Sequence, residues 1–290
     1  MYAIRKKDLK AFTPQAEDVC RIPEGNTNPY LSEARAIEEF LKSVEPVYNS
    51  AVEKLMTDKI DGDCIYVIAG FVAYILTCSP TAMRLHSAPM KHMIEETGKA
   101  LDSDDEIAQA PAELPSKSFT ELLASGLISV QVDPKYPQAV GTVSIIKRIN
   151  AFGNFKWEVL VNTFADSPFF TSDFPVAVEK TANIQILNWL VPLTPTLAIR
   201  ICPDFEHDPR QEQSDLSFSH FRRVVRNLTR QEVMYVNRLL VQCAETTVFF
   251  RDNHAWVPDF IRKNAGFRLC LRTVTRGQLH WFTHEIQRHP

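Results

Sequence analysis

The hydrophobic period of the chain changes near Lys156, and this change constrains the fold more than any other feature of the sequence. Before it, apolar residues recur every three or four positions over residues 32–55, as on one face of an amphipathic helix. After it, Trp157, Val159 and Val161 alternate with their neighbours, which predicts a strand. Helical periodicity returns at about residue 217. Helices, then strands, then helices again predict an α+β fold rather than a βαβ alternation.

We therefore expect a mainly helical α+β fold with a small, largely antiparallel sheet from about residue 156 to residue 202. A single domain over residues 1–290 is predicted, because the strand block is too small to bury both of its faces alone. Its helical part covers about residues 32–150, and a C-terminal helical part covers about residues 217–290. The acidic, proline-bearing stretch 102–116 predicts a loop.

Three helices are expected in the first part of the chain. The helix over 32–55 should be kinked at Pro46. A second, from Cys64 to Cys78, is so apolar that it resembles a membrane span. Ser79-Pro80-Thr81 interrupts the run before it reaches the roughly 20 apolar residues that a span needs, which favours a buried core helix capped by Asp63. A third helix should begin beyond Pro89.

Shorter elements are expected at the two ends of the chain. Closely spaced prolines in the first thirty residues predict only an extended or hairpin piece. Near the C-terminus, strands are predicted at Thr247–Arg251 and Phe267–Thr273, with a short helix from Pro258 between them.

Composition excludes several classes of protein. There are 32 Lys and Arg against 35 Asp and Glu, so the net charge of -3 does not favour nucleic acid or an anionic membrane. None of the nine glycines forms a G-x-G or P-loop pattern, which excludes dinucleotide and P-loop sites. The six cysteines form no C-x-x-C pair, and the N-terminus lacks the apolar core of a secretory signal. These features predict a reduced, cytoplasmic protein; no cofactor or partner is indicated.

The sharpest polar cluster is Thr171-Ser172-Asp173. Hydroxyls and a carboxylate at a strand end can point into one pocket, where Asp173 would act as a general base or hold a metal-bound water. The alternative is a turn in which Asp173 bonds nearby backbone N–H groups ahead of Pro175.

Two further sets of charged residues are candidates. Glu38 and Glu45 lie two helical turns apart and would bind a divalent cation together, or simply form a solvated face. A row of arginines beside Asn227 would hold a phosphate or carboxylate if it formed one stripe of a helix, and would otherwise be solvated or paired with Glu232 or Asp215. The row consists of Arg222, Arg223, Arg226 and Arg230.

His280 and His284 have the spacing of a zinc pair on a helix, but no third ligand is evident. A solvated tail is the favoured interpretation, and no metal site is predicted at these histidines.

Four stretches resemble an uncharacterised, mainly bacterial family, domain of unknown function (DUF) 4238. Residues 169–176 (Phe-Phe-Thr-Ser-Asp-Phe-Pro-Val) are similar to the signature of that family. Residues 37–45, 189–195 and 225–237 resemble its early helix, its proline-bearing strand and its late helix, in the same order. Together the four stretches cover roughly residues 1 to 260.

The chain departs from the pattern of that family in two places. Family members begin with a histidine-histidine-x-x-proline segment, and this chain starts after the place where it would sit. Cys78 stands where the family has an arginine. If those residues form an active site in relatives, we expect this chain to be a truncated or inactive version.

Two hypotheses of function follow. The first is a hydrolase of a phosphodiester or nucleotide, with Asp173 as acid/base or metal ligand beside Thr171 and Ser172. Glu38 would assist by binding metal, and Arg226 with Asn227 by stabilising an anion. The second is a non-catalytic binding or regulatory protein. Convergence of Asp173, Glu38 and Arg226 in the folded chain would distinguish the two hypotheses.

Overall fold

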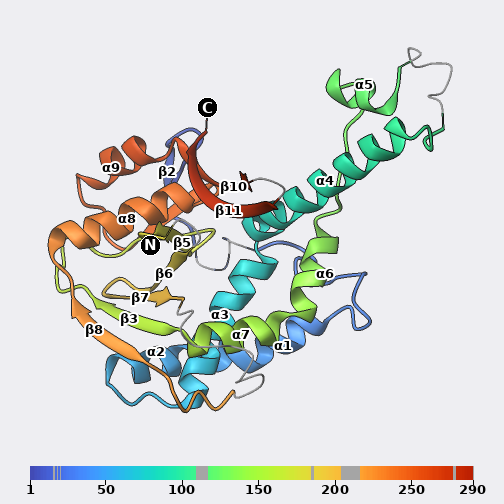
Figure 1. The fold of residues 1–290 in the computed structure, drawn as a ribbon. Helices are drawn as coiled ribbons and strands as arrows, with labels where there is room; N and C mark the ends of the chain where they lie inside the picture. The colour runs from blue at the N-terminus through green and yellow to red at the C-terminus, as the bar shows by residue number, and fades with distance from the viewer. Residues whose placement is uncertain are drawn as a thin grey trace.

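The computed structural model describes residues 1–15, 17, 19, 21–108, 117–183, 186–203, 216–276 and 279–289. It is an α+β fold with several small, mostly antiparallel sheets. The largest sheet has five strands. In Figure 1 it lies between α8 (Arg230–Cys243) and α9 (Val257–Asn264) on one side and α2 (Tyr48–Met56), α3 (Gly62–Cys78) and α7 (Ile145–Asn154) on the other. The distal part of α4 (Pro80–Ser103) and the short α5 (Phe119–Ala124) project away from this body.

The N-terminal hairpin predicted from the prolines is confirmed. It consists of β1 (Tyr2–Arg5) and β2 (Ala11–Phe12). Strand β1 also pairs with β9 (Thr247–Phe250), which pairs in turn with β4 (Thr171–Ser172). The resulting sheet has the order β2-β1-β9-β4 and joins the N-terminal hairpin, through β9, to the signature segment.

The first predicted helix is interrupted at Pro46, as expected. It forms α1 (Ala36–Val44), a 3-10 turn (Glu45–Val47) and α2 (Tyr48–Met56). The apolar run forms α3 (Gly62–Cys78), which is largely buried. Its cap is Asp61 rather than the predicted Asp63, because the helix begins two residues earlier and Asp61 Oδ1 accepts a hydrogen bond of 2.8 Å from Cys64 N.

The third helix begins earlier than predicted. Helix α4 (Pro80–Ser103) starts with Pro80 in its first turn and Ser79 as its cap, and Pro89 lies inside it. The prediction was wrong because proline suits a first helical turn, whereas the single amide lost at Pro89 did not end the helix. Residues 102 and 103 of the predicted loop belong to α4, and residues 109–116 lie outside the described residues.

The remaining helices of this layer are α5 (Phe119–Ala124), α6 (Lys135–Val143) and α7 (Ile145–Asn154).

The predicted strand block forms most of a five-stranded sheet with the order β5-β6-β7-β3-β8. Its strands are β3 (Lys156–Val161), β5 (Ala177–Lys180), β6 (Leu187–Thr194), β7 (Leu197–Cys202) and β8 (Arg223–Asn227). Strand β8 runs parallel to β3, and the other neighbouring strands are antiparallel.

Strand β8 corrects the prediction of a helix from about residue 217. Val224 and Val225 occur at a spacing that fits a helix face, but these β-branched residues pair along the free edge of β3 instead. Arg223 and Arg226 therefore lie on a strand and Arg230 begins a helix, so the predicted helical stripe of arginines does not form.

The C-terminal part is less helical than predicted. It contains α8 (Arg230–Cys243) and α9 (Val257–Asn264), followed by a hairpin of β10 (Phe267–Arg276) and β11 (Leu279–Arg288). The predicted strands at 247–251 and 267–273 and the helix from Pro258 are confirmed. The expectation of a helix or a solvated tail at His284 was wrong, because this segment pairs with β10 along its whole length.

The core lies between the central sheet and its helices. Trp157 of β3 is fully buried, and its indole N–H donates a 2.7 Å hydrogen bond to the carbonyl of Phe152 in α7. Among the described residues, no single helix is long and apolar enough to cross a membrane. Helices α3 and α4 have the length and composition only when taken together, and they are bent by 56° relative to each other.

Candidate functional site

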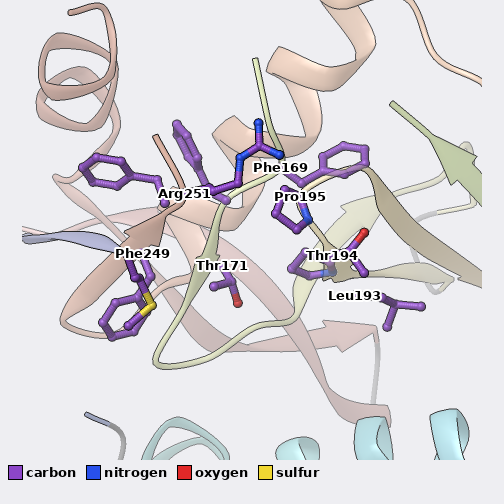
Figure 2. A pocket seen from close by; sticks show the side chains of 11 residues that line it. Phe169, Thr171, Leu193, Thr194, Pro195, Phe249 and Arg251 are labelled. Carbon is purple, nitrogen blue, oxygen red and sulfur yellow. The ribbon is translucent and has the colours of Figure 1, made fainter. Parts of the chain in front are cut away.

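A cavity of about 320 Å³ lies where β4 and β9 meet the turn between β6 and β7. Figure 2 shows the side chains around it. Most of them are apolar. The complete set consists of Met1, Phe169, Phe170, Thr171, Pro192, Leu193, Thr194, Pro195, Phe249, Phe250 and Arg251. Its volume is at the lower end of the range of about 300–1,000 Å³ that is usual for small-molecule sites.

Hydrogen bonds fix the wall that the signature segment forms. The backbone N–H of Phe169 donates to the carbonyl of Pro195 at 2.9 Å, which joins this wall to the β6–β7 turn. The fully buried Asn237 of α8 holds the same wall from behind. Its Oδ1 accepts from Phe170 N and its Nδ2 donates to the carbonyl of Pro168, both at 2.9 Å. The cavity is therefore bounded by restrained backbone.

Aromatic rings pack against one another along this wall. Phe170 stacks on Trp256, with ring centroids 5.6 Å apart and planes at 19°. Phe250 stacks on Tyr2 at 5.9 Å. Phe169, Phe170, Phe249 and Phe250 are each at most 5 % exposed. Such packed rings form an apolar floor that holds its shape.

Three of the lining residues contribute polar side-chain atoms. Thr194 shares a 3.2 Å contact with the hydroxyl of Thr196 within its own turn. The hydroxyl of Thr171 has no hydrogen-bond partner among the residues that the structure describes. Arg251, directly after β9, is the only member of the lining set with a charged side chain. The site therefore offers a hydroxyl and a guanidinium to a largely apolar ligand.

Asp173 follows Thr171 on the same segment, but it is not among the lining residues. Its carboxylate accepts from the backbone N–H groups of Glu245 at 3.0 Å, of Thr246 at 2.7 Å and of Thr247 at 3.2 Å. The hydroxyl of Thr246 donates to it as well. Asp173 therefore holds the turn between α8 and β9, whereas the alternative interpretation placed its hydrogen bonds in a local turn ahead of Pro175.

Asp173 is partly buried near the ammonium of Lys6. Burial raises the pKa of its carboxyl, while hydrogen bonds from Thr246 and Thr247 and the charge of Lys6 oppose that rise. Burial also lowers the pKa of Lys6 to about 8. The ammonium of Lys6 donates to the carbonyls of Ala244 at 2.6 Å and Phe267 at 2.8 Å.

The hydroxyl of Ser172 is also used within its own segment. It donates to the carbonyl of Phe174 at 2.7 Å and accepts from the N–H of the same residue at 3.2 Å. Of the three predicted cluster residues, Thr171 alone lines the cavity.

The other predicted site residues lie on separate elements with partners of their own. Glu38 of α1 forms an ion pair with Arg35 at 2.5 Å. Arg226 of β8 bonds Glu158 at 3.2 Å and Glu232 at 2.8 Å. Asn227 is exposed at the end of β8. Asp173, Glu38 and Arg226 share no partner among these interactions, so the structure does not bring them together. Within the described ranges, no group of three or more His, Cys, Asp or Glu is arranged to hold a metal ion.

A family model matches residues 1–254, which is most of the chain, and its description is "Protein of unknown function (DUF4238)". The chain belongs to this family. No curated protein matches the chain. No solved structure matches it either. The β10–β11 hairpin follows the part of the chain that matches DUF4238.

Three of the four stretches that resemble DUF4238 meet at the cavity. Residues 169–171 form one wall, residues 192–195 form the opposite one, and Asn237 of the late helix fixes the first. The fourth stretch lies on α1, where Ile37 packs with Leu41 and Cys78.

Sequence reasoning missed Asn237, Phe249 and Arg251 as parts of this site. Asn237 had a detectable signal, because it is a polar residue within the apolar face formed by Val233, Val236 and Leu240. Phe249 and Arg251 had none, because an aromatic strand that ends in a charged residue is common.

Proposed function

We propose that this protein is a non-catalytic binding protein that takes a small, mainly apolar ligand in the cavity between β4, β9 and the β6–β7 turn. The convergence of three separate stretches of the chain on one aromatic-lined cavity carries this proposal. Restrained backbone and buried rings favour a preformed site, which reduces the entropy lost on binding.

The hydrolase hypothesis has less support. It requires Asp173 to present its carboxylate to a substrate, together with Glu38 and Arg226. Three backbone N–H groups and one hydroxyl donate to that carboxylate. A general base must reach the proton that it removes, and an acceptor already occupied in a turn is poorly placed to do so. The geometry therefore favours binding.

The proposal is tested by calorimetric titration of the full chain with a neutral aromatic probe, naphthalenemethanol. The key variant is Thr171→Trp, which fills the cavity from its wall. Val225→Trp is the matched control, because Val225 lies on β8 and is 55 % exposed. We expect wild type and the control to bind the probe, and Thr171→Trp to bind at least about tenfold more weakly, a loss of about 1.4 kcal/mol.

Circular dichroism establishes that the variants fold. If Thr171→Trp does not, Leu193→Trp fills the cavity from the opposite wall. Absence of saturable binding to wild type, or equal binding to the cavity-filling variant, would overturn the proposal.

A further inference from the structure

Arg251 is placed between the apolar cavity and solvent. It follows the buried pair Phe249 and Phe250 directly, and its side chain is 46 % exposed. In the view of Figure 2, Arg251 lies among the labelled lining side chains, on the side of Phe169 and Pro195 rather than of Leu193. A ligand with its apolar part among the rings would therefore have one end near this cation.

The guanidinium is held in position while part of it stays free. Nε donates to the carboxylate of Asp252 at 2.6 Å, and Nη2 makes a long contact of 3.4 Å with the carbonyl of Ala165. Within the described part of the chain, Nη1 has no hydrogen-bond partner. Asp252 balances the charge of Arg251 and also orients its plane, so the free N–H groups form a fork with limited freedom.

We propose that the ligand of this cavity is an amphipathic anion, with an aromatic or aliphatic body among the phenylalanines and a carboxylate or phosphate group on Arg251. This inference rests on the proposed function. The guanidinium fork matches the geometry of both head groups. The hydroxyl of Thr171 supplies a further donor from the wall. The remaining lining side chains carry no charge and most of them are apolar, so the opposite end of the ligand meets mainly apolar groups.

The experiment compares three probes that share one ring system: naphthoate, naphthyl phosphate and naphthalenemethanol. Each is titrated into wild type, Arg251→Gln and Arg251→Lys at low ionic strength. Arg262→Gln is the matched control, because Arg262 is an exposed arginine of α9 paired with Asp259 at 2.8 Å. We expect wild type to bind at least one anionic probe roughly tenfold more tightly than the alcohol.

Arg251→Gln should lose that preference without a change in affinity for the alcohol. Arg251→Lys should retain part of it, because the charge remains while the fork is lost. The anionic probe that binds wild type more tightly then identifies the preferred head group as carboxylate or phosphate.

The two proposals fail in different ways. If the alcohol and both anions bind wild type equally, or Arg251→Gln keeps the full preference, the inference about the anion is overturned while the cavity remains a binding site. If none of the three probes binds wild type, both proposals are overturned.

Discussion

At the scale of single residues, Asp173 shows how a signature residue can be structural. Its carboxylate joins β4 to a turn more than 70 positions away, where it accepts from consecutive backbone N–H groups of Glu245, Thr246 and Thr247. The same turn is held by other charges. Arg84 bonds the carboxylate of Glu245 at 2.8 Å, and Arg268 pairs with it too. Because β9 begins at Thr247, this turn also fixes the start of the strand that reaches the cavity.

Replacing Asp173 should therefore affect folding before it affects binding. Asp173→Ala leaves several donors of the turn without an acceptor, and we expect the free energy of unfolding to fall by about 1–3 kcal/mol. Urea unfolding measures the change. Glu38→Gln is the control: its partner Arg35 is exposed, so we expect a change within about 0.5 kcal/mol. An unchanged stability in Asp173→Ala would contradict the structural role.

At the scale of elements, α4 is supported unevenly. Its buried residues, Thr81, Ala82 and Leu85, all lie in the first two turns. The distal part projects from the body in Figure 1 and is accompanied by α5. Asp102 of α4 accepts from the N–H groups of Phe119 and Thr120 at 3.0 Å, which attaches the start of α5 to the end of α4. Gly98 lies against the ring of Phe119.

A methyl group at Gly98 should separate these two helices. A Cβ there would lie 2.4 Å from a ring carbon of Phe119, so the ring must move. In Gly98→Ala we expect faster hydrogen exchange of the amides of residues 119–124. The global free energy of unfolding should change little, because alanine stabilises the interior of a helix by about 1 kcal/mol relative to glycine and so offsets the lost contact with Phe119. Gly266→Ala is the control, since nothing lies within 4 Å of its Cβ position. Unchanged exchange in α5 would show that the contact with Gly98 does not hold it.

At the scale of the whole molecule, the C-terminal hairpin docks on the body beside basic side chains. His284 of β11 contacts the ring of Trp189 in β6, with centroids 5.4 Å apart. His284 and His86 of α4 have pKa values lowered to about 4, mainly by burial and also by the charge of Arg148 in α7. Arg148 donates to the carbonyl of Leu76 at 2.8 Å, so its cation is fixed near them.

These shifts predict a loss of stability in acid. The pKa of each histidine lies below its ordinary value of 6.5, so unfolding takes up protons between about pH 6.5 and about pH 4. The free energy of unfolding is therefore unaffected by these histidines above that window. It falls as the pH falls through the window, by at most about 1.4 kcal/mol per pH unit for each histidine.

Urea unfolding at about pH 7 and about pH 5 tests this dependence. His86→Gln and His284→Gln should each show a smaller difference between the two conditions than wild type. His92→Gln, an exposed residue of α4, is the control and should match wild type. Equal pH dependence in all four proteins would contradict the assignment.

Local patterns determined the order of the elements. The α+β class, the interruption at Pro46, the buried α3 and the strands β3 and β7 all follow from which side chains face the core. Such patterns report that a face is buried, but they do not identify its partner. Residues 223–227 show this limit, because valines at helical spacing formed β8 once the edge of β3 was available to them.

The candidate site depended on the tertiary structure. Asp173, Glu38 and Arg226 are plausible site residues in the sequence, yet in the folded chain each of them bonds to different residues. The cavity instead arises where Phe169, Pro195 and Arg251, far apart in the chain, are brought together by the pairing of β4 with β9 and by Asn237. The sequence by itself determined most of the strands and helices, but not β8 or β11. Only the folded chain decided which side chains share a cavity, because pairing across distant positions leaves no periodic signal.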